Sequence, residues 1–599
     1  MNTKNSHFGF DTRKIASNCC ILAKKEKSMS HATPPSYLKS AIKQIYRDDD
    51  DFILIGLTGR TGSGCSTVAS ILQHPKEDIK HSLFIGQNPA SSEARKERII
   101  LKFFEFDWHP FLLIQVRSII TTFLLERSSN EAVDYLNDII TEEKREAVTT
   151  VLDEIRITQE KHISASQFYS IDLPQGAERL KNILGENNFV RVYQKIGKNI
   201  RVSGSAFSEE LASGKFFSLA EKIQNAIEEI HQEQKSRSQR TFIVIDTLRN
   251  PLEALFFQDR YSSFYLLAVS TPEEDRQRRL RKLNYSENEI KQLDETEYTS
   301  RDINDERFYS VQDIQGCLQR ADIYVSNPDV VDEVSKYASL SNQLIRFVSL
   351  IRRPGIVTPT AIERCMQVAH TAKLNSGCIS RQVGAAVTDQ GFGVRAIGWN
   401  DVPRGQIPCN LRSRTELLAG TSNSAYSDFE RSDNEYLGKF RTKSSAFRVI
   451  LTNGRNDAYC FKSDYNEFKD EKNQVHTRSL HAEENAFLQL TMSGASISKG
   501  AKLFTTASPC ELCSKKAYQL GIETIIYIDP YPGIAVDHVL GIGAIRPTLE
   551  LFSGAIGRAF HKLYTPVVAY KDELNAMVGY EIPKMTADKP AATSQRTDS

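Results

Sequence analysis

The strongest restriction on the fold is a short apolar run that leads directly into a glycine-rich run. Phe52–Leu57 has the pattern of a buried strand, and Val68–Leu72 begins a helical pattern. Between them lies Gly59-Arg60-Thr61-Gly62-Ser63-Gly64-Cys65-Ser66-Thr67. In this order, the backbone N–H groups of the loop and the N-terminus of the helix surround phosphate oxygens. The spacing therefore predicts a P-loop nucleotide-binding domain.

Further apolar runs follow, separated by long charged segments with helical periodicity. They are Leu101–Phe106, Thr241–Ile245, Phe264–Val269 and Ile323–Val325. Apolar strands that alternate with helices favour a mostly parallel sheet covered on both faces. We therefore expect an α/β fold for this part of the chain.

One residue of the loop departs from the usual pattern. Cys65 stands where a lysine normally reaches the β- and γ-phosphates, and a neutral thiol cannot stabilise the charge of a transferring phosphoryl group. Ser66 is the expected Mg²⁺ ligand, and Asp246, which follows the strand Thr241–Ile245, is the expected carboxylate beside the ion. The loop thus predicts nucleotide binding with Mg²⁺ but without kinase activity.

Two other segments of this region are candidates for a role at phosphates. Asp107 could face an acceptor, and the basic segment Asp275–Arg281 could form a lid. Asp107 and Asp246 equally fit a simpler role, in which a carboxylate at a strand end caps the following loop. The glycine-rich loop together with Phe242–Asn250, Phe264–Leu283 and Arg320–Asn327 resembles small-molecule and nucleotide kinases. The resemblance implies a P-loop kinase-like fold.

A second set of residues predicts a zinc centre. His481 and Glu483 begin a helical run, and Cys510 and Cys513 begin another in Pro-Cys-Glu-Leu-Cys. One imidazole and two thiolates suit tetrahedral Zn²⁺ and leave its fourth position for water. His-x-Glu followed by Pro-Cys-x-x-Cys is the signature of zinc deaminases, in which the glutamate is the general acid–base and not a ligand. The pattern predicts hydrolytic deamination of cytosine at C4.

Simpler roles remain open for the metal residues. Cys460 could complete a closed structural zinc site, although such a site has no need of Glu483. Cys378, Cys409 and His476 could hold a second metal, but buried unreactive thiols and a surface imidazole are the more economical interpretation.

The region from about Pro359 resembles the deoxycytidylate deaminase family. The resemblance rests on Asn375–Val387, Gly398–Gly405, His481–Ala486 and the metal cysteines. It implies a three-layer α/β cytidine deaminase-like domain, Zn²⁺, and a free cytosine deoxynucleotide as substrate. It also implies that Asn400 contacts the sugar and Arg381 the phosphates. Asn400 equally fits a turn residue at a hairpin end, and Arg381 a solvated charge.

Changes in composition and in the spacing of apolar runs and turn residues suggest the domain boundaries. We expect a polar extension over 1–47, a P-loop kinase-like domain over 48–345, a deaminase-like zinc domain over 346–575 and a disordered tail over 576–599. The polar stretch 406–480 is expected to be an insertion in the zinc domain.

Charge and hydropathy bear on localisation and partners. Lys and Arg number 76 against 75 Asp and Glu, a net charge of +1, so the whole chain gives no support for nucleic-acid or membrane binding. No stretch approaches the ~20 apolar residues of a membrane span, and the run Ile15–Ala23 is broken by polar residues. We expect a soluble, cytoplasmic protein.

The order of a degenerate glycine-rich loop and the zinc motifs resembles the bacterial anti-phage dCTP deaminases over most of residues 50–570. The resemblance implies conversion of dCTP to dUTP, and of dCMP to dUMP as a second activity, which depletes dCTP during infection. It further implies a homo-oligomer and, in some members, an inhibitory small RNA. Our own hypothesis is that the glycine-rich loop binds a nucleoside triphosphate effector that gates the deaminase. A housekeeping dCMP deaminase, a polynucleotide deaminase and a nucleotide kinase with a deaminase-like regulatory module are the rival interpretations.

Overall fold

The computed structural model describes residues 52–79, 91–161, 164–297, 311–329, 333–528 and 535–578. The predicted extension over 1–47 and nearly all of the predicted tail lie outside these residues. The chain divides into two compact units, of which one spans residues 49–565. The other consists of residues 1–48 and 566–599, and its described element is helix α26 (Tyr570–Val578). All other elements below belong to the first unit.

The first sheet has the strand order β11-β5-β4-β1-β3-β2. The strands are β1 (Phe52–Thr58), β2 (Leu112–Gln115), β3 (Thr241–Asp246), β4 (Phe264–Ser270), β5 (Ile323–Ser326) and β11 (Gly554–Ala555). All neighbours are parallel except β11, which pairs antiparallel with β5. The predicted, mostly parallel sheet is therefore confirmed, with β1 at its centre.

Side chains of β1 alternate between two cores, as the period of a strand requires. Ile53 and Ile55 face one core, and Leu54 faces the other. The first core is covered by α3 (Cys65–Gln73), α4 (Ser92–Phe106), α16 (Glu333–Arg352) and α25 (Gly557–Tyr564). Buried on both faces, the strand can be apolar throughout.

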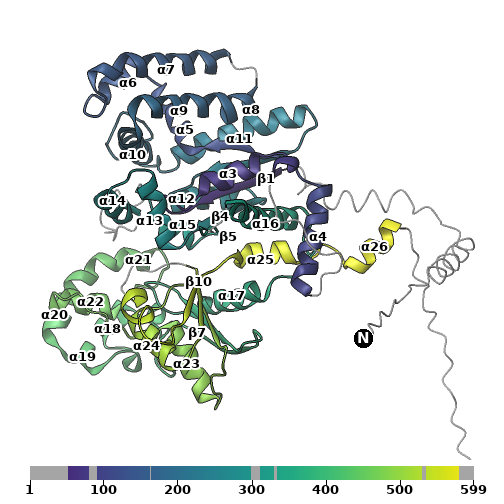
Figure 1. Ribbon diagram of the computed structural model, residues 1–599. Coiled ribbons are helices and arrows are strands. Elements are labelled where there is room, and N and C mark those ends of the chain that lie inside the picture. Colours follow the sequence, from purple (N-terminus) through teal and green to yellow (C-terminus); the bar gives the residue numbers. More distant parts are fainter. Residues whose placement is uncertain are drawn as a thin grey trace, which may run out of the picture. The chain divides into compact units, whose positions relative to one another are not determined.

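A helical region lies between β2 and β3 (Figure 1). Its helices are α5 (Val116–Leu124), α6 (Ser129–Tyr135), α7 (Glu142–Lys161), α8 (Ala165–Gln167), α9 (Leu173–Leu184), α10 (Glu186–Ser203) and α11 (Ser218–Ser236). Their apolar stripes join the core on the Leu54 side of the sheet. The remaining helices of this part are α12 (Pro251–Arg260), α13 (Glu273–Lys282), α14 (Glu287–Glu297) and α15 (Ile314–Leu318).

The predicted strand at Leu101–Phe106 is wrong. These residues form the last turns of α4, whose first turn is capped by Ser91. Ile100, Leu101 and Phe104 are buried at helical spacing, whereas Phe106 is 86% exposed. The apolar run is therefore one stripe of an amphipathic helix, and the strand of this part of the sheet is β2.

The second sheet has the order β10-β9-β8-β6-β7. Its strands are β6 (Gly384–Thr388), β7 (Val394–Trp399), β8 (Lys502–Thr505), β9 (Thr524–Tyr527) and β10 (Thr548–Leu551). Helix α17 (Ala361–Ala372) covers one face, where Ala386 and Phe504 are buried. Helices α23 (Ala482–Met492) and α24 (Glu511–Gln519) cover the other, where Ala385 and Leu503 are buried. The result is a three-layer arrangement.

Residues between β7 and α23 form a small helical group of their own (Figure 1). Its helices are α18 (Arg414–Ala419), α19 (Asp428–Ser432), α20 (Asn434–Ser444), α21 (Arg448–Thr452) and α22 (Phe461–Lys469). Tyr436 and Tyr459 belong to a separate aromatic core. The chain returns at Leu480, whose N–H donates to the Asp401 carbonyl at 2.8 Å, so the ends of the segment meet.

Glu363 on α17 connects the two sheets. It is 1% exposed, and its carboxylate accepts hydrogen bonds from Ala555 N at 3.0 Å, Tyr564 Oη at 2.6 Å and Arg346 Nη2 at 3.1 Å. These donors belong to β11, α25 and α16, which pack on the first sheet. One buried carboxylate therefore holds elements of both sheets together.

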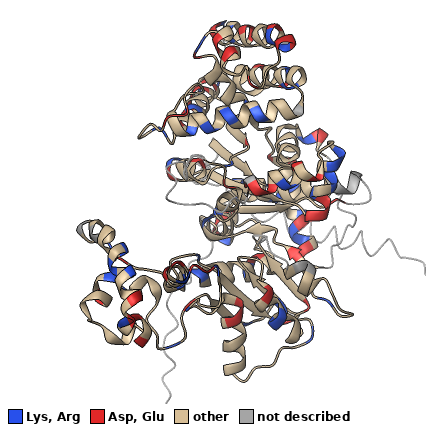
Figure 2. Cartoon of the chain, turned by 90° about the vertical axis from the view of Figure 1, so that its left-hand side faces the viewer, with Lys and Arg blue, Asp and Glu red and all other residues tan. Residues whose placement is uncertain are grey.

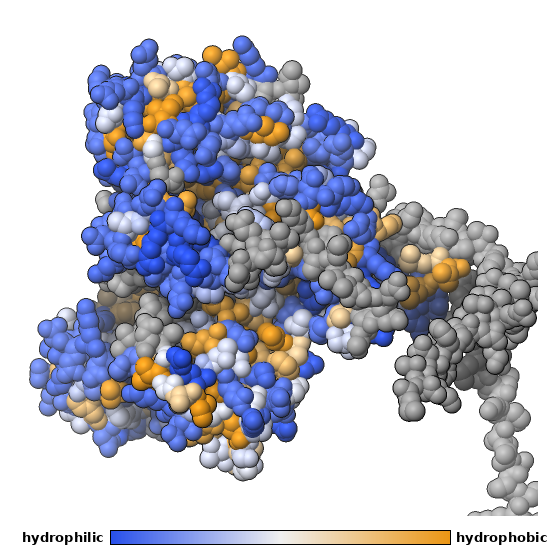
Figure 3. Space-filling view, in the orientation of Figure 1, coloured by the Kyte–Doolittle hydropathy of each residue, from blue (hydrophilic) through white to orange (hydrophobic). Residues whose placement is uncertain are grey.

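The surface of the described residues is mainly polar. Both signs of charge are spread over the helices (Figure 2), and on the face shown in Figure 3 hydrophobic residues form small, separate patches. Within the described ranges, no helix combines the length and the apolar composition needed to cross a membrane.

We predict that Glu363→Ala lowers the free energy of unfolding by about 3–5 kcal/mol, because it leaves Arg346 and two buried donors without their acceptor. Glu131→Ala is the matched control, since Glu131 occupies the same capping-box position in α6 but is exposed. Denaturant unfolding of both variants measures the difference. Equal, small losses in the two variants would contradict the role given to Glu363.

Candidate functional site

The N-termini of α23 and α24 bring the predicted metal ligands together. His481 is the N-cap of α23 and follows Leu480, which pairs with Asp401 beyond the end of β7. Gly398 on β7 permits this packing, because a Cβ there would overlap the Ala482 carbonyl oxygen and the backbone of α23. Asn485 Nδ2 adds a hydrogen bond to the Trp399 carbonyl at 2.9 Å. The position of the imidazole is thus set by β7.

The two cysteines approach the imidazole from α24. His481 Nδ1 lies 3.3 Å from Cys510 Sγ and 3.5 Å from Cys513 Sγ. In a tetrahedral zinc site with Zn–S of about 2.3 Å and Zn–N of about 2.0 Å, nitrogen and sulfur lie about 3.5 Å apart. The three donors therefore fit Zn²⁺ in both chemistry and spacing.

The two thiols and the imidazole share protons. The Cys513 thiol and His481 donate to the Cys510 sulfur, which lowers the pKa of Cys510 to about 3, and the same hydrogen bond raises the pKa of Cys513. Both helix N-termini contribute partial positive charge that favours thiolates. Among the described residues, His481, Cys510 and Cys513 are the one group of three such donors close enough to hold a metal ion. Cys460 does not join them, and Cys378, Cys409 and His476 form no comparable cluster.

Glu483 lies beside the metal ligands and is 4% exposed. Its Oε1 is 2.8 Å from the hydroxyl of Thr505, the last residue of β8. Burial raises the pKa of the Glu483 carboxyl, which favours its protonated form, and a carboxyl at this place is within reach of groups that exchange protons with it. Thr505 is a site residue that the sequence analysis did not identify.

Asn400 fixes the loop that precedes β6. Its Oδ1 accepts a hydrogen bond from Val383 N at 2.7 Å, and its Nδ2 donates to the Arg381 carbonyl at 2.6 Å. The simpler role as a structural residue at the hairpin end therefore describes its contacts within the chain. Contact of Asn400 with a sugar and of Arg381 with phosphates stays a prediction.

The glycine-rich loop has the backbone that its sequence predicts. Gly62 and Gly64 have φ values of 87° and 102°, which side chains rarely adopt, and Gly64 is the N-cap of α3. Ser66 Oγ donates to Asp246 Oδ2 at 3.0 Å. The two residues expected to organise Mg²⁺ thus lie together, because β3 is next to β1.

Protein groups already occupy part of this loop. The Glu297 carboxylate, 1% exposed, accepts hydrogen bonds from Thr61 N at 2.8 Å and Thr61 Oγ1 at 2.6 Å. Arg276 donates to the Thr61 carbonyl and Arg279 to the Ser63 carbonyl. Two of the four arginines of the predicted lid, Arg276 and Arg279, therefore bind loop carbonyls and also pair with the carboxylates of Glu273, Asp294 and Asp329.

Remaining predicted residues of this region have structural surroundings. Burial, with the nearby Asp246 charge, raises the pKa of Cys65 to about 12, so its thiol is uncharged. Arg60 is paired with Asp294. Asp107 caps α4; although burial alone would raise its pKa, hydrogen bonds from His109, Arg352 and Arg240 lower it overall. Asp107 is therefore a half-buried ion-pair partner of Arg352 and Arg240, and it follows a helix, not the strand end that was expected.

The comparisons with known proteins concern the second sheet and its helices. Residues 359–529 match the model of the cytidine and deoxycytidylate deaminase zinc-binding region. A stretch of 167 residues is 28% identical to the deoxycytidylate deaminase of Enterobacteria phage T4 and covers 28% of this chain and 76% of the phage protein. Another of 54 residues is 41% identical to the ComE operon protein 2 of Bacillus subtilis (strain 168), covering 9% of this chain and 28% of that protein.

Among solved structures, the apo dCMP deaminase of cyanophage S-TIM5 aligns with 33% of this chain and 100% of its own, at 21% identity and a TM-score of 0.20. Three metal donors beside a buried carboxylate have the composition of an open zinc site. The C-terminal part of the chain carries a zinc domain of the cytidine and deoxycytidylate deaminase family.

We predict that the purified protein binds one zinc ion per chain at this site. Cys513→Ser should abolish stoichiometric zinc, because two donors hold the ion far more weakly than three. Cys460→Ser should leave the zinc content unchanged. Metal analysis by mass spectrometry of the two variants decides between an open site and a closed site that uses Cys460; loss of zinc in Cys460→Ser would indicate the latter.

Proposed function

We propose that this chain is a zinc-dependent hydrolase that deaminates free cytosine deoxynucleotides, with dCTP as its main substrate and dCMP as a second. The observation that carries the proposal is the burial of Glu483 beside His481, Cys510 and Cys513. A structural zinc site has no use for such a carboxylate, whereas a deaminase needs one to move protons.

The proposed chemistry follows from these positions. Zinc, when bound, supplies the Lewis acidity that activates a water molecule for attack. Glu483 takes a proton from that water and delivers it to the N3 nitrogen of cytosine as the C4–O bond forms. It then transfers the second water proton to the amino group, so that the C4–N bond breaks and ammonia leaves. Thr505, in contact with Glu483 Oε1, holds the carboxylate in place.

The choice of substrate rests on several lines of support. The relatives include deoxycytidylate deaminases of phages T4 and T2, which favours a cytosine deoxynucleotide. The choice of dCTP over dCMP as the main substrate rests on the resemblance to the anti-phage dCTP deaminases, which pair a degenerate glycine-rich loop with a zinc domain. On the same ground we propose that the reaction depletes dCTP during phage infection in the cytoplasm, in a homo-oligomer restrained by an effector or a small RNA.

We predict that Glu483→Gln lowers the rate of uracil-nucleotide formation by at least ~10²–10⁴-fold, because the general acid–base is lost, while zinc stays bound. Glu550→Gln, exposed on the edge strand β10, is the matched control and should retain full activity. Ammonia release and product mass with deoxycytidine, dCMP, dCTP and CTP measure the outcome.

The same substrate series, with single-stranded DNA added to it, separates the two rival deaminase functions. Preference for dCMP over dCTP would favour a housekeeping deaminase. Reaction with single-stranded DNA alone would overturn the assignment to free nucleotides.

For the glycine-rich loop we infer a second function, binding of a nucleoside triphosphate with Mg²⁺. The hydrogen bond between Ser66 and Asp246 supports the Mg²⁺ position, and the uncharged Cys65 argues against phosphoryl transfer. The Glu297 carboxylate occupies an amide that a phosphate would otherwise use. Nucleotide binding therefore requires Glu297 to leave the loop.

We predict that Glu297→Gln raises the affinity for Mg·ATP by at least about tenfold, because a neutral amide competes less well for the Thr61 donors. Glu274→Gln, exposed on α13, is the control with the same charge change. Ser66→Ala should remove the Mg²⁺ dependence of binding. Titration calorimetry with and without Mg²⁺ measures both effects, and equal affinities in the wild type and Glu297→Gln would contradict the competition.

A further inference from the structure

The three metal donors belong to two separate helices, so the zinc site depends on how these helices pack. His481 is the N-cap of α23, whereas Cys510 and Cys513 lie at the N-terminus of α24. Both helices cover the same face of the second sheet. A shift of one helix along the other by about 1 Å would exceed the deviation of about 0.2 Å that metal–ligand distances allow. The register of the two helices is therefore part of the metal site.

Apolar packing defines this register only weakly. Gly398 and Asn485 fix α23 on β7, so α24 is the helix that has to be placed. From α24 the core on this face receives the buried Ala517, with the half-buried ring of Tyr518 beside it. Alanine offers a single methyl group, and the hydrophobic effect has no direction. A directional contact between the helices is needed to fix their register.

An ion pair joins the two helices one turn beyond the metal donors. Glu484 on α23 follows His481 by three residues, and Lys516 on α24 follows Cys513 by three. Because residues three apart share a helix face, Glu484 and Lys516 continue the same two faces on which His481 meets Cys513. Lys516 Nζ donates to Glu484 Oε1. Among the described residues, this is the one ion pair that links α23 to α24.

The same carboxylate also contacts a metal ligand. Glu484 is the N3 residue of a capping box, and its Oε2 accepts a hydrogen bond from His481 N at 3.4 Å. One oxygen of Glu484 thus binds the residue that supplies the imidazole, and the other binds the helix that supplies the thiolates. The helix dipoles favour both charges, since Glu484 lies in the first turn of α23 and Lys516 in the last turn of α24.

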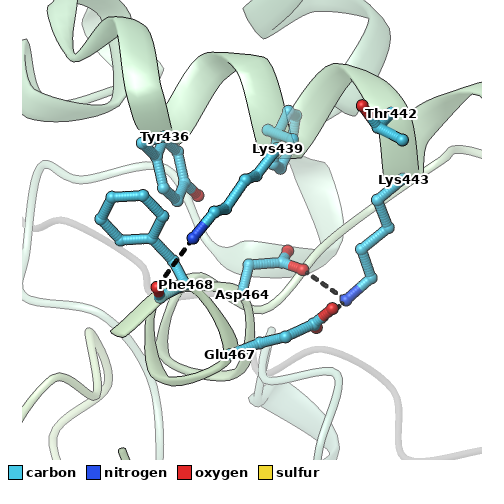
Figure 4. Close-up of a pocket in the computed structure, with 8 residues that line it drawn as sticks. Tyr436, Lys439, Thr442, Lys443, Asp464, Glu467 and Phe468 are labelled. Atoms are coloured by element: carbon cyan, nitrogen blue, oxygen red, sulfur yellow. Dashed lines mark hydrogen bonds and ion pairs between the residues drawn. The ribbon is translucent and has the colours of Figure 1, made fainter. Parts of the chain in front are cut away.

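A second contact between a lysine and carboxylates of two helices serves as a comparison (Figure 4). A groove of about 440 Å³ lies between α20 and α22. There Lys443 on α20 points to Asp464 and Glu467 on α22 (Figure 4). The pair of Lys443 and Glu467 has the same chemistry as that of Lys516 and Glu484, but it joins helices that carry none of the three metal donors.

We propose that Glu484 and Lys516 are positioning residues of the zinc site, which keep α24 in register with α23 and so slow the loss of the metal. Neither is one of the three metal donors. The pair is partly exposed, with 27% of the Glu484 and 44% of the Lys516 side chain accessible, so it contributes little to the free energy of unfolding. Its effect falls on the arrangement of the donors. This inference rests on the zinc site, but not on the proposed deamination.

The test measures how fast the full-length, zinc-loaded protein releases zinc to the chromogenic chelator 4-(2-pyridylazo)resorcinol. We expect Glu484→Gln and Lys516→Gln each to release zinc at least about tenfold faster than the wild type, as is typical when a group that orients a ligand is lost. Glutamine at position 484 keeps an acceptor for His481 N, so the change reports the ion pair. The double variant should be no faster than the faster single variant, because both substitutions break one contact. Lys516→Arg should keep the slow rate.

Glu467→Gln is the matched control, since it removes the same charge from the comparison pair and should leave zinc release unchanged. Thermal unfolding of the metal-free proteins should differ little among all variants. Wild-type release rates in both folded single variants would overturn the proposal, and so would additive effects in the double variant or equally fast release from Glu467→Gln. Failure of the proposed deamination is a separate outcome, because zinc release is measured without substrate. A wild-type protein that binds no zinc would overturn the metal site and this inference together.

Discussion

The buried carboxylate of Glu363 is the interaction on which the relation between the two sheets depends. Glu363 stands on α17, the helix that covers one face of the second sheet. Its carboxylate binds the backbone of β11, the hydroxyl of Tyr564 and the guanidinium of Arg346, which all belong to the side of the first sheet. A buried charge with several donors is rigid, since any rearrangement leaves it unsatisfied. The same contact holds α17 between the sheets, where this helix covers one face of the second sheet.

The pattern of apolar residues predicted those strands in which every residue is buried. The strands β1, β3, β4 and β5 are buried on both faces, so apolar runs identified them. The same criterion failed at Leu101–Phe106, where an apolar run is the buried stripe of a helix. It also missed β11, because a strand of two residues is defined by its partner β5 and has no pattern of its own.

Within the candidate site, the sequence revealed what short spacing controls. His481 with Glu483, and Cys510 with Cys513, lie within single helical turns. Their sequence spacing was therefore enough to predict a metal site with a catalytic carboxylate, without knowledge of how the two helices pack. Thr505 and Gly398 act across strands and helices that are distant in sequence. Thr505 belongs to no recognised motif, and the segment Gly398–Gly405, although it carries the family resemblance, does not reveal that Gly398 makes room for α23.

In the proposed nucleotide site, Cys65 separates the requirements of binding from those of transfer. Arg60 and Arg249 lie 3.6 Å and 3.4 Å from the Glu297 carboxylate, and Arg60 is also paired with Glu273 and Asp294. The cations of the resting loop are thus matched by carboxylates. A lysine at position 65 would add a further cation, which the charge of a triphosphate would balance. Nucleotide binding would use the loop amides and the pair of Ser66 and Asp246, whereas phosphoryl transfer needs the missing cation as well. On this proposal the chain has the groups for binding and lacks the residue for transfer.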